Sequence, residues 1–278
     1  AFGAHAIKNG LAPVLIGLMR GGWITHFATN GAGVIHDWEF AFQGFTGEDV
    51  QRYVAEGQFG LWQETGLYLN LALAVGAYEG RGYGESVGAF VANDGLKIPF
   101  PCDLDAAIAA GAAADADDET LARAAAAADL KAITRHISAS PGFLQVPHPF
   151  KEYGLQAAAY LSGTPLTAHP MFGHDIIYTH PLNRGAPIGR TADRAAFHAA
   201  FRQVQDRLLR LKGIVDFGTG PVLVESVFDT LGERPFTGTR PRFGITVIGW
   251  KITAEELTHA FAPALHATNV PLVQLKQL

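Results

Sequence analysis

The sequence predicts an α/β fold in which a doubly wound, mostly parallel sheet carries helices on both faces. Short apolar runs alternate with helix-patterned segments along the 278 residues, as expected of strands joined by helical crossovers. Three of these runs end in polar, glycine-containing segments, as strands of an open sheet do at their carboxyl ends. Hydrophobic residues make up 48% of the chain and charged residues 17%, so we expect extensive burial within a single domain.

The individual elements follow from local patterns. Apolar residues recur at helical spacing over 11–18, where Pro13 suits a first turn and Gly21 ends the helix. Thr46 to Asp49 resembles a capping box, which predicts Thr46 as the N-cap of a helix toward Gly57. Further helices are expected at 65–78, 85–92, 155–161, 195–211 and 255–265. Strands are expected at 24–28, 166–170, 214–217 and 245–248, and loops at 141–149 and 237–242.

An alanine-rich insertion occupies about residues 104–130. Alanine favours helix strongly, but this segment offers few large apolar side chains with which a helix could be anchored. An acidic patch lies at 115–119. We therefore expect one or two surface helices joined by a flexible acidic link.

Composition and charge exclude several classes of protein. A net charge of -5 and a pI near 6.1 disfavour sequence-independent binding of nucleic acid. The single cysteine, Cys102, excludes an internal disulfide framework and suits a reducing cytoplasm. No apolar run of about 18 residues predicts a membrane-spanning helix, and no signal peptide is visible. The chain begins without Met, inside patterned sequence, so its N-terminus is expected to be incomplete.

The first strand-end cluster runs from Thr29 to Glu39. Thr29, Asn30 and Gly31 combine small side chains with backbone N–H groups, which suits contact with a cofactor phosphate or ribose. His36 follows as a candidate acid or base, and Asp37 as a candidate substrate-binding carboxylate. The spacing is not the G-x-G-x-x-G fingerprint, and an ordinary glycine turn explains it equally well.

The second cluster, Thr167 to His180, contains three histidines and Asp175 around a glycine. His174 is a candidate catalytic residue and Asp175 a candidate carboxylate for a polar or cationic substrate. Histidines that cap helices or bond to the backbone are the alternative. The spacing matches no established zinc motif, so no metal site is predicted.

The third cluster, Val215 to Glu225, has a Gly-x-Gly turn after a strand, followed by what reads as the start of an apolar helix. Gly218 and Gly220 are therefore candidate contacts for a cofactor phosphate. Farther on, Lys251 stands between a tryptophan and an isoleucine. A lysine in apolar surroundings can act as a nucleophile, although such a lysine more often reaches the surface.

Several segments of the chain resemble sequence motifs of a known family. H-A-I-K-N-G-L (His5 to Leu11) and T-N-G-A-G-V-I-H-D (Thr29 to Asp37) are similar to the N-I-S-S-G-L and T-T-A-G-G-V-E-E-D segments of deoxyhypusine synthases. The bacterial deoxyhypusine-synthase-like proteins are closer still, with N-G-A-G-x-I-H-D and then an E-T helix, here Glu64-Thr65. They also carry T-V-H-x-x-x-G-x-D-I-I-H-x-H-P, seen here as Thr167 to Pro181.

The resemblance implies a Rossmann-like fold, NAD as the cofactor and a homotetramer built as a dimer of dimers. It places Thr29, Asn30 and Gly31 at positions that contact NAD, Gly218 and Gly220 in a cofactor turn, and Asp175 at a carboxylate that binds polyamine. The chain departs from the synthases at Ile35-His36, which replaces paired glutamates, and at Glu225, which replaces a histidine. Trp250-Lys251 matches only part of the family's lysine motif.

Three functions remain open. The first is an NAD-dependent enzyme that oxidises the C–N bond of a small amine to an imine, with Lys251 as the residue that could transfer an alkylamine group. His36, His174 or Asp175 would move the proton, and Glu225 would help bind the substrate. The second is a hydrolase or lyase that uses histidine and aspartate without a nicotinamide. The third is a non-catalytic, oligomeric assembly protein with the same fold.

Overall fold

The computed structural model describes residues 1–171 and 173–192, together with Glu256 and the backbone of five strands between residues 208 and 277. Beyond residue 192, side chains are described only for Val224, Glu233 and Glu256. The chain divides into two compact units, the first comprising 1–105 and 126–195 and the second 106–125 and 196–278. Because two compact units can belong to one domain or to two, the single domain expected from the sequence stays a prediction.

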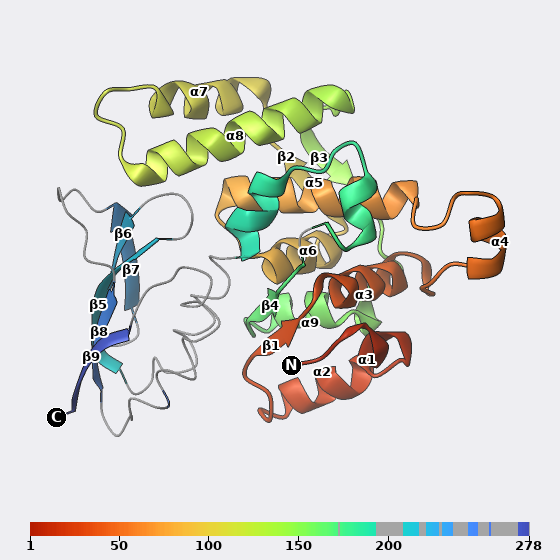
Figure 1. Ribbon diagram of the computed structural model, residues 1–278, viewed down its shortest axis with the longest axis horizontal. Helices are drawn as coiled ribbons and strands as arrows, with labels where there is room; N and C mark the ends of the chain where they lie inside the picture. The colour runs from red at the N-terminus through yellow and green to blue at the C-terminus, as the bar shows by residue number, and fades with distance from the viewer. Residues whose placement is uncertain are drawn as a thin grey trace. The chain divides into compact units, whose positions relative to one another are not determined.

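Helices dominate the first unit (Figure 1). The labelled α-helices of the chain are α1 (Ala4–Lys8), α2 (Ala12–Arg20), α3 (Gly31–Gln43), α4 (Val50–Ala55), α5 (Gln63–Glu79), α6 (Tyr83–Ala92), α7 (Pro101–Gly111), α8 (Asp118–His136) and α9 (Leu155–Leu161). Residues 185–192 are also helical, and the boundary between the two units falls within α7 and within α8. Two short 3-10 helices are η1 (Lys151–Tyr153) and η2 (Ile176–Thr179). The strands up to residue 192 are β1 (Phe27–Thr29), β2 (Gly95–Ile98), β3 (Gly142–Gln145) and β4 (Leu166–Ala168).

The core of the first unit forms where α6 contacts α5, α9 and β4. Glycines on α6 make these approaches close. A Cβ at Gly88 would lie 2.5 Å from the carbonyl oxygen of Gln156 on α9, and one at Gly84 would overlap the backbone of Leu166 on β4. On α5, a Cβ at Gly76 would overlap the Ser86 side chain. These small residues allow the backbones to approach more closely than a bulkier surface would permit.

A two-stranded parallel sheet, β1 and β4, supplies the carboxyl edge that the sequence predicts. Phe27 pairs with Leu166 and Thr29 with Ala168, so both strands end at the same level. The backbone N–H of His169 donates to the Thr29 carbonyl at 2.8 Å, which extends the pairing by one residue. The segments after β1 and β4 therefore leave the sheet side by side.

The second unit contains a five-stranded sheet in the order β7-β6-β5-β8-β9. Its strands are β5 (Leu208–Asp216), β6 (Pro221–Val227), β7 (Thr230–Pro235), β8 (Gly244–Gly249) and β9 (Leu272–Gln277). Only β8 and β9 pair in parallel, and the other neighbours in this sheet are antiparallel. The mixture of helices and strands agrees with an α/β fold, but the described strands do not form the mostly parallel sheet expected from the sequence.

Several local predictions are wrong for identifiable reasons. Asp49, and not Thr46, is the N-cap of α4, because the Asp49 carboxylate accepts from the Arg52 N–H at 3.0 Å. The expected loop at 141–149 contains β3, which pairs antiparallel with the unpredicted β2. The expected helix at 195–211 ends inside β5, and its residues up to 207 lie outside the described part.

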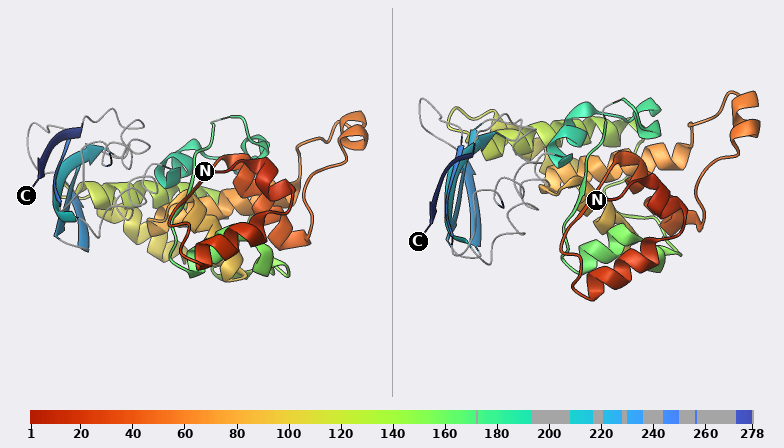
Figure 2. Two further views of the ribbon diagram at one scale, coloured as in Figure 1. Left: turned by 90° about the horizontal axis from the view of Figure 1, so that it is seen from below. Right: turned by 60° about the horizontal axis from the view of Figure 1, so that its bottom comes forward.

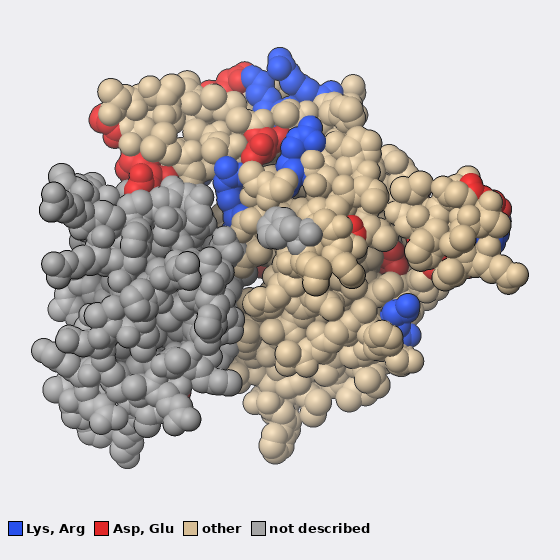
Figure 3. Space-filling view, in the orientation of Figure 1, with Lys and Arg blue, Asp and Glu red and all other residues tan. Residues whose placement is uncertain are grey.

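The alanine-rich insertion forms two helices, α7 and α8, as predicted. A Cβ at Gly111 would overlap the methyl group of Ala124, so the two helices pack closely near their connection. Asp115, Asp117 and Glu119 are exposed around that connection, where Figure 3 shows a group of acidic side chains. Over the remainder of the described surface in Figure 3 most side chains are uncharged.

Helix α4 and its flanking segments project from the first unit in every view (Figure 2). Phe45, Val54, Phe59 and Leu61 are all more than half exposed in this projection. None of the helices in the described part of the chain combines the length and the apolar composition needed to cross a membrane.

Candidate acid–base site at the start of α3

The end of β1 leads directly into α3. Asn30 is the N-cap of this helix, and its side-chain oxygen accepts from the Gly33 N–H at 2.9 Å. Thr29 is buried, and its hydroxyl has no hydrogen-bond partner within the described residues. A Cβ at Gly33 would overlap that hydroxyl, so the glycine is needed for the tight turn. Local structure thus explains Asn30 and Gly33, whereas it gives no role to the buried Thr29 hydroxyl.

Asp175, from the second cluster, lies against the first residue of α3. A Cβ at Gly31 would lie 2.7 Å from the carboxylate carbon of Asp175, which explains why this position is glycine. Burial raises the pKa of Asp175, while the neighbouring His174 and His36 act in the opposite direction. The structure therefore brings Gly31, His36, His174 and Asp175 together, as expected for two strands that end at one edge.

His36 is held by a short chain of polar contacts. Its Nδ1 lies 2.6 Å from the Thr46 hydroxyl and 3.4 Å from the Glu39 carboxylate. The Thr46 hydroxyl donates to Glu39, so its oxygen must accept from an N–H on His36 Nδ1. Glu39 is buried and also accepts from Thr65 at 3.2 Å. Because this network places a proton on Nδ1, the neutral form of the imidazole has its lone pair on Nε2, where it can accept a proton.

Two tyrosines lie near Asp175. Tyr83 is fully buried, and its hydroxyl has no hydrogen-bond partner within the described residues. Burial, followed by the charge of Asp175, raises the Tyr83 pKa. The same two causes raise the pKa of Tyr178 to about 12. Both phenols therefore remain protonated in the neutral range.

The sequence predicted Thr46 only as a helix N-cap, and it gave no functional role to Thr65, Tyr83 or Tyr178. Glu39 stands three residues after His36 on one helix, and this spacing brings two side chains to the same face. That signal was available in the sequence. The contributions of Thr46 and Tyr83 were not, because each depends on how distant segments pack.

A separate chain of contacts crosses the β1–β4 pair behind this edge. The Thr167 hydroxyl lies 3.0 Å from His26 Nε2 and 2.9 Å from His169 Nε2. Burial, and then the proximity of His169, lower the pKa of His26 to about 4. Burial also lowers the pKa of His169. These histidines are neutral at pH 7, and both contact the Thr167 hydroxyl on β4.

Asp37 does not join the group around Asp175. Its carboxylate accepts from the backbone N–H groups of Leu155 and Gln156, each at 2.9 Å, and from the Gln156 side chain at 3.1 Å. These contacts satisfy the first N–H groups of α9. Burial raises the Asp37 pKa, although the hydrogen bonds from Gln156 and Leu155 oppose that effect. The contacts give Asp37 a structural role in joining α3 to α9.

The remaining predicted residues lie in the second unit. Gly218, Gly220 and Lys251 are outside the described residues, and for Glu225 the structure describes only the backbone, in β6. The helix expected after the Gly-x-Gly turn is wrong, because β6 follows and pairs antiparallel with β5. No helix begins at β6, so no helix dipole is present at that point to bind a phosphate.

The start of α3 does not fit a phosphate group of NAD. Asp175 occupies the space beside Gly31, and a carboxylate at that point would repel a phosphate. A ribose hydroxyl could donate to such a carboxylate, so the geometry retains only this part of the expected cofactor contact. Within the described residues, no group of three or more histidine, cysteine or acidic side chains is arranged to hold a metal ion.

Comparisons of the chain with family models, curated proteins and solved structures found no match. The function is therefore inferred from the arrangement of His36, Glu39, Thr46 and Asp175.

Proposed function

We propose that this protein is an enzyme that acts on a small cationic amine by acid–base catalysis at the start of α3. The observation that carries the proposal is the His36 network. Glu39 and Thr46 fix the imidazole so that Nε2 keeps its lone pair, and Asp175 lies close enough to be influenced by His36.

In this proposal the two groups have different tasks. Asp175 binds the substrate's ammonium group, because an ammonium would compensate the half-buried carboxylate electrostatically. His36 Nε2 removes a proton from the bound amine or from an attacking water. Glu39 stabilises the imidazolium that forms, through the Thr46 hydroxyl. A positioned general base of this kind contributes about 10²- to 10⁴-fold to a reaction rate.

A second candidate is the NAD-dependent oxidation of a C–N bond, with alkylamine transfer to Lys251. It is favoured by one observation beyond the resemblance to deoxyhypusine synthases: Asp175 lies at the same edge as His36 and Gly31. This candidate keeps the Rossmann-like sheet and the homotetramer as proposals. It requires the phosphates of NAD to bind elsewhere than at the start of α3.

The test is to measure binding and turnover of a panel of diamines and polyamines by the purified protein, with and without NAD. Formation of NADH supports the second candidate, whereas release of ammonia without NAD supports hydrolysis or elimination. Asp175→Asn should weaken amine binding at least about tenfold, since it removes one charge and keeps the shape. His36→Asn should lower turnover about 100-fold and change amine affinity little.

His5→Gln is the matched control, because His5 is exposed on α1. Absence of amine binding would overturn both candidates. Equal activity of the wild type and His36→Asn would overturn the assignment of the base.

A further inference from the structure

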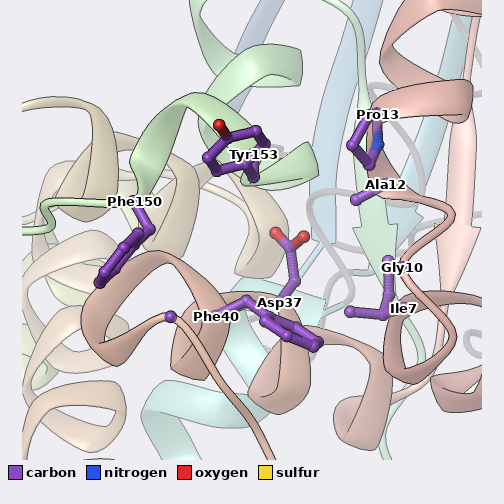
Figure 4. Close-up of a pocket in the computed structure, with 9 residues that line it drawn as sticks. Ile7, Gly10, Ala12, Pro13, Asp37, Phe40, Phe150 and Tyr153 are labelled. Carbon is purple, nitrogen blue, oxygen red and sulfur yellow. The ribbon is translucent and has the colours of Figure 1, made fainter.

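A pocket of about 260 Å³ lies on a different side of α3, between α1, the start of α2 and η1. Ile7, Phe40, Phe150 and Tyr153 form most of its apolar wall (Figure 4). An engineered cavity of about 150 Å³ is already large enough to bind benzene. The pocket therefore has room for a single-ring molecule with a short side chain.

The wall of this pocket is held in place by the fold. Ile7 is 1% exposed, in the core cluster between α1, α2 and α9. A Cβ at Gly44 would lie 2.9 Å from the Phe150 ring, so the glycine allows the ring to pack against the end of α3. Gly44 also has a φ of 80°, which disfavours other residues there. Phe150 and Tyr153, respectively 41% and 52% exposed, form the more open part of the wall.

Asp37 is the one charged side chain among the residues that line the pocket. Figure 4 shows its carboxylate directed into the space enclosed by Ile7, Pro13 and Tyr153, whereas the Tyr153 hydroxyl points away from it. The carboxylate accepts three N–H groups, two of them at one oxygen. A carboxylate offers about four acceptor positions, so one position on the Oδ1 atom remains. No lysine or arginine of the described residues forms an ion pair with Asp37.

We propose that this pocket binds a small primary amine with an apolar, ring-sized body. The ammonium group donates to the remaining acceptor position of Asp37, and the hydrocarbon part packs against Phe40, Phe150 and Ile7. A buried carboxylate without an ion-pair partner is costly, and a bound ammonium offsets that cost. The neighbouring aromatic rings also favour a cation.

The proposed site is separate from the acid–base site. His36 and Asp37 are neighbours in sequence, but His36 contacts Thr46 and Glu39 while Asp37 contacts the start of α9. The ligands differ as well: an apolar wall selects a monoamine with a hydrophobic body, and a diamine or polyamine would leave a second charge against that wall. The inference therefore stands or falls independently of the proposed function.

Isothermal titration of the full chain with phenethylamine tests the proposal, with phenethyl alcohol as the neutral probe of similar shape. Saturable binding of the amine is expected, at least about tenfold tighter than that of the alcohol. Phe150→Ala and Tyr153→Ala should each weaken amine binding several-fold, and both positions are exposed enough for the fold to tolerate the change. Asp37→Asn should reduce the preference for the amine, provided that circular dichroism shows a folded protein.

Leu18→Ala is the matched control, since Leu18 is an exposed apolar residue of α2 that does not line the pocket. Asp175→Asn, which should weaken amine binding at the acid–base site, should likewise leave phenethylamine binding unchanged. Equal affinity for amine and alcohol, or binding that Phe150→Ala and Tyr153→Ala do not affect, would overturn the proposal. Loss of phenethylamine binding in Asp175→Asn would place the amine in the acid–base site instead.

Discussion

Two histidine–carboxylate pairs involve helix α3 in different surroundings: His36 and Glu39 lie on the helix, whereas His148 and Asp94 lie elsewhere and contact it through Trp38. On one side, Trp38 donates to Nε2 of His148 at 3.1 Å, while Asp94 lies 3.8 Å from Nδ1. His148 is 1% exposed, and Phe90 packs against its ring edge-on at 4.7 Å. On the other side, the His36 side chain is 19% exposed, and among the described residues Thr46 and Glu39 engage its Nδ1 alone.

The difference shows that a histidine beside a carboxylate is not by itself a site. Both nitrogens of His148 face protein, and aromatic rings exclude substrate from it. His36 also lies beside a carboxylate, but it keeps an available Nε2 and partial exposure. Access and a remaining lone pair, more than the presence of the pair, separate a catalytic candidate from a structural histidine.

The largest expected effect is on the packed side of α3. Asp37→Ala should lower the free energy of unfolding by about 3–5 kcal/mol, because it leaves two buried backbone N–H groups of α9 and the Gln156 amide without their acceptor. Chemical denaturation monitored by circular dichroism measures the change. Asp175→Asn is the control and should change stability by less than about 1 kcal/mol. Similar losses in the two variants would erase the distinction between the two carboxylates.

The buried histidine predicts a dependence of stability on pH. Burial lowers the pKa of His148 to about 4, against an ordinary value of 6.5 in the unfolded chain. Between those pH values the unfolded state binds the proton more tightly than the folded state does. The contribution of neutral His148 to the free energy of unfolding is therefore complete above pH 6.5 and is lost as the pH falls toward 4. The loss is on the order of 3 kcal/mol. Denaturation at several pH values should show this slope, and His148→Gln should flatten it. An unchanged slope in His148→Gln would assign the effect to other groups, such as His26.

Helices whose ends are marked by glycine could be predicted from the sequence. Helix α9 coincides with its expected range, and α5 ends at Gly80, whose left-handed conformation is the usual way to end a helix. The meeting of the first two clusters was also predictable, because parallel strands share a carboxyl edge. The pairing of β2 with β3 was not, since the two strands are four residues each and lie on opposite sides of the alanine-rich insertion.

The sequence predicted several residues of the acid–base site correctly, but it did not predict all of their roles. His36 and Asp175 come together as expected, but Asp37 is occupied by the start of α9, a segment more than a hundred residues away. The second unit shows the same limit. A Gly-x-Gly turn precedes a helix in one fold and connects antiparallel strands in another, and only the pairing of β5 with β6 decides between them.

A smaller effect is expected when the link between His36 and Glu39 is removed. Thr46→Val keeps the shape of the side chain but removes the hydroxyl that joins the two groups. Turnover should fall about tenfold, equivalent to about 1.4 kcal/mol, because the imidazole loses its orienting partner. Steady-state kinetics on the amine found to be a substrate measures the change. Unchanged turnover would mean that Glu39 does not act through Thr46.

The smallest effect distinguishes a structural from a cofactor-binding role for Thr29. Its hydroxyl is buried and unpartnered among the described residues, so Thr29→Val should leave stability within about 1 kcal/mol or raise it slightly. Thermal unfolding with increasing NAD then separates the two roles, because a ligand at free concentration c that binds the folded state stabilises it by RT ln(1 + c/Kd), so a weaker ligand raises the unfolding temperature less at the same concentration. If the wild type responds to NAD and Thr29→Val responds less, the hydroxyl contacts the cofactor. If the two respond alike, the unpartnered hydroxyl plays no part in binding NAD. If neither responds, the acid–base reaction without a nicotinamide becomes the stronger of the two candidates.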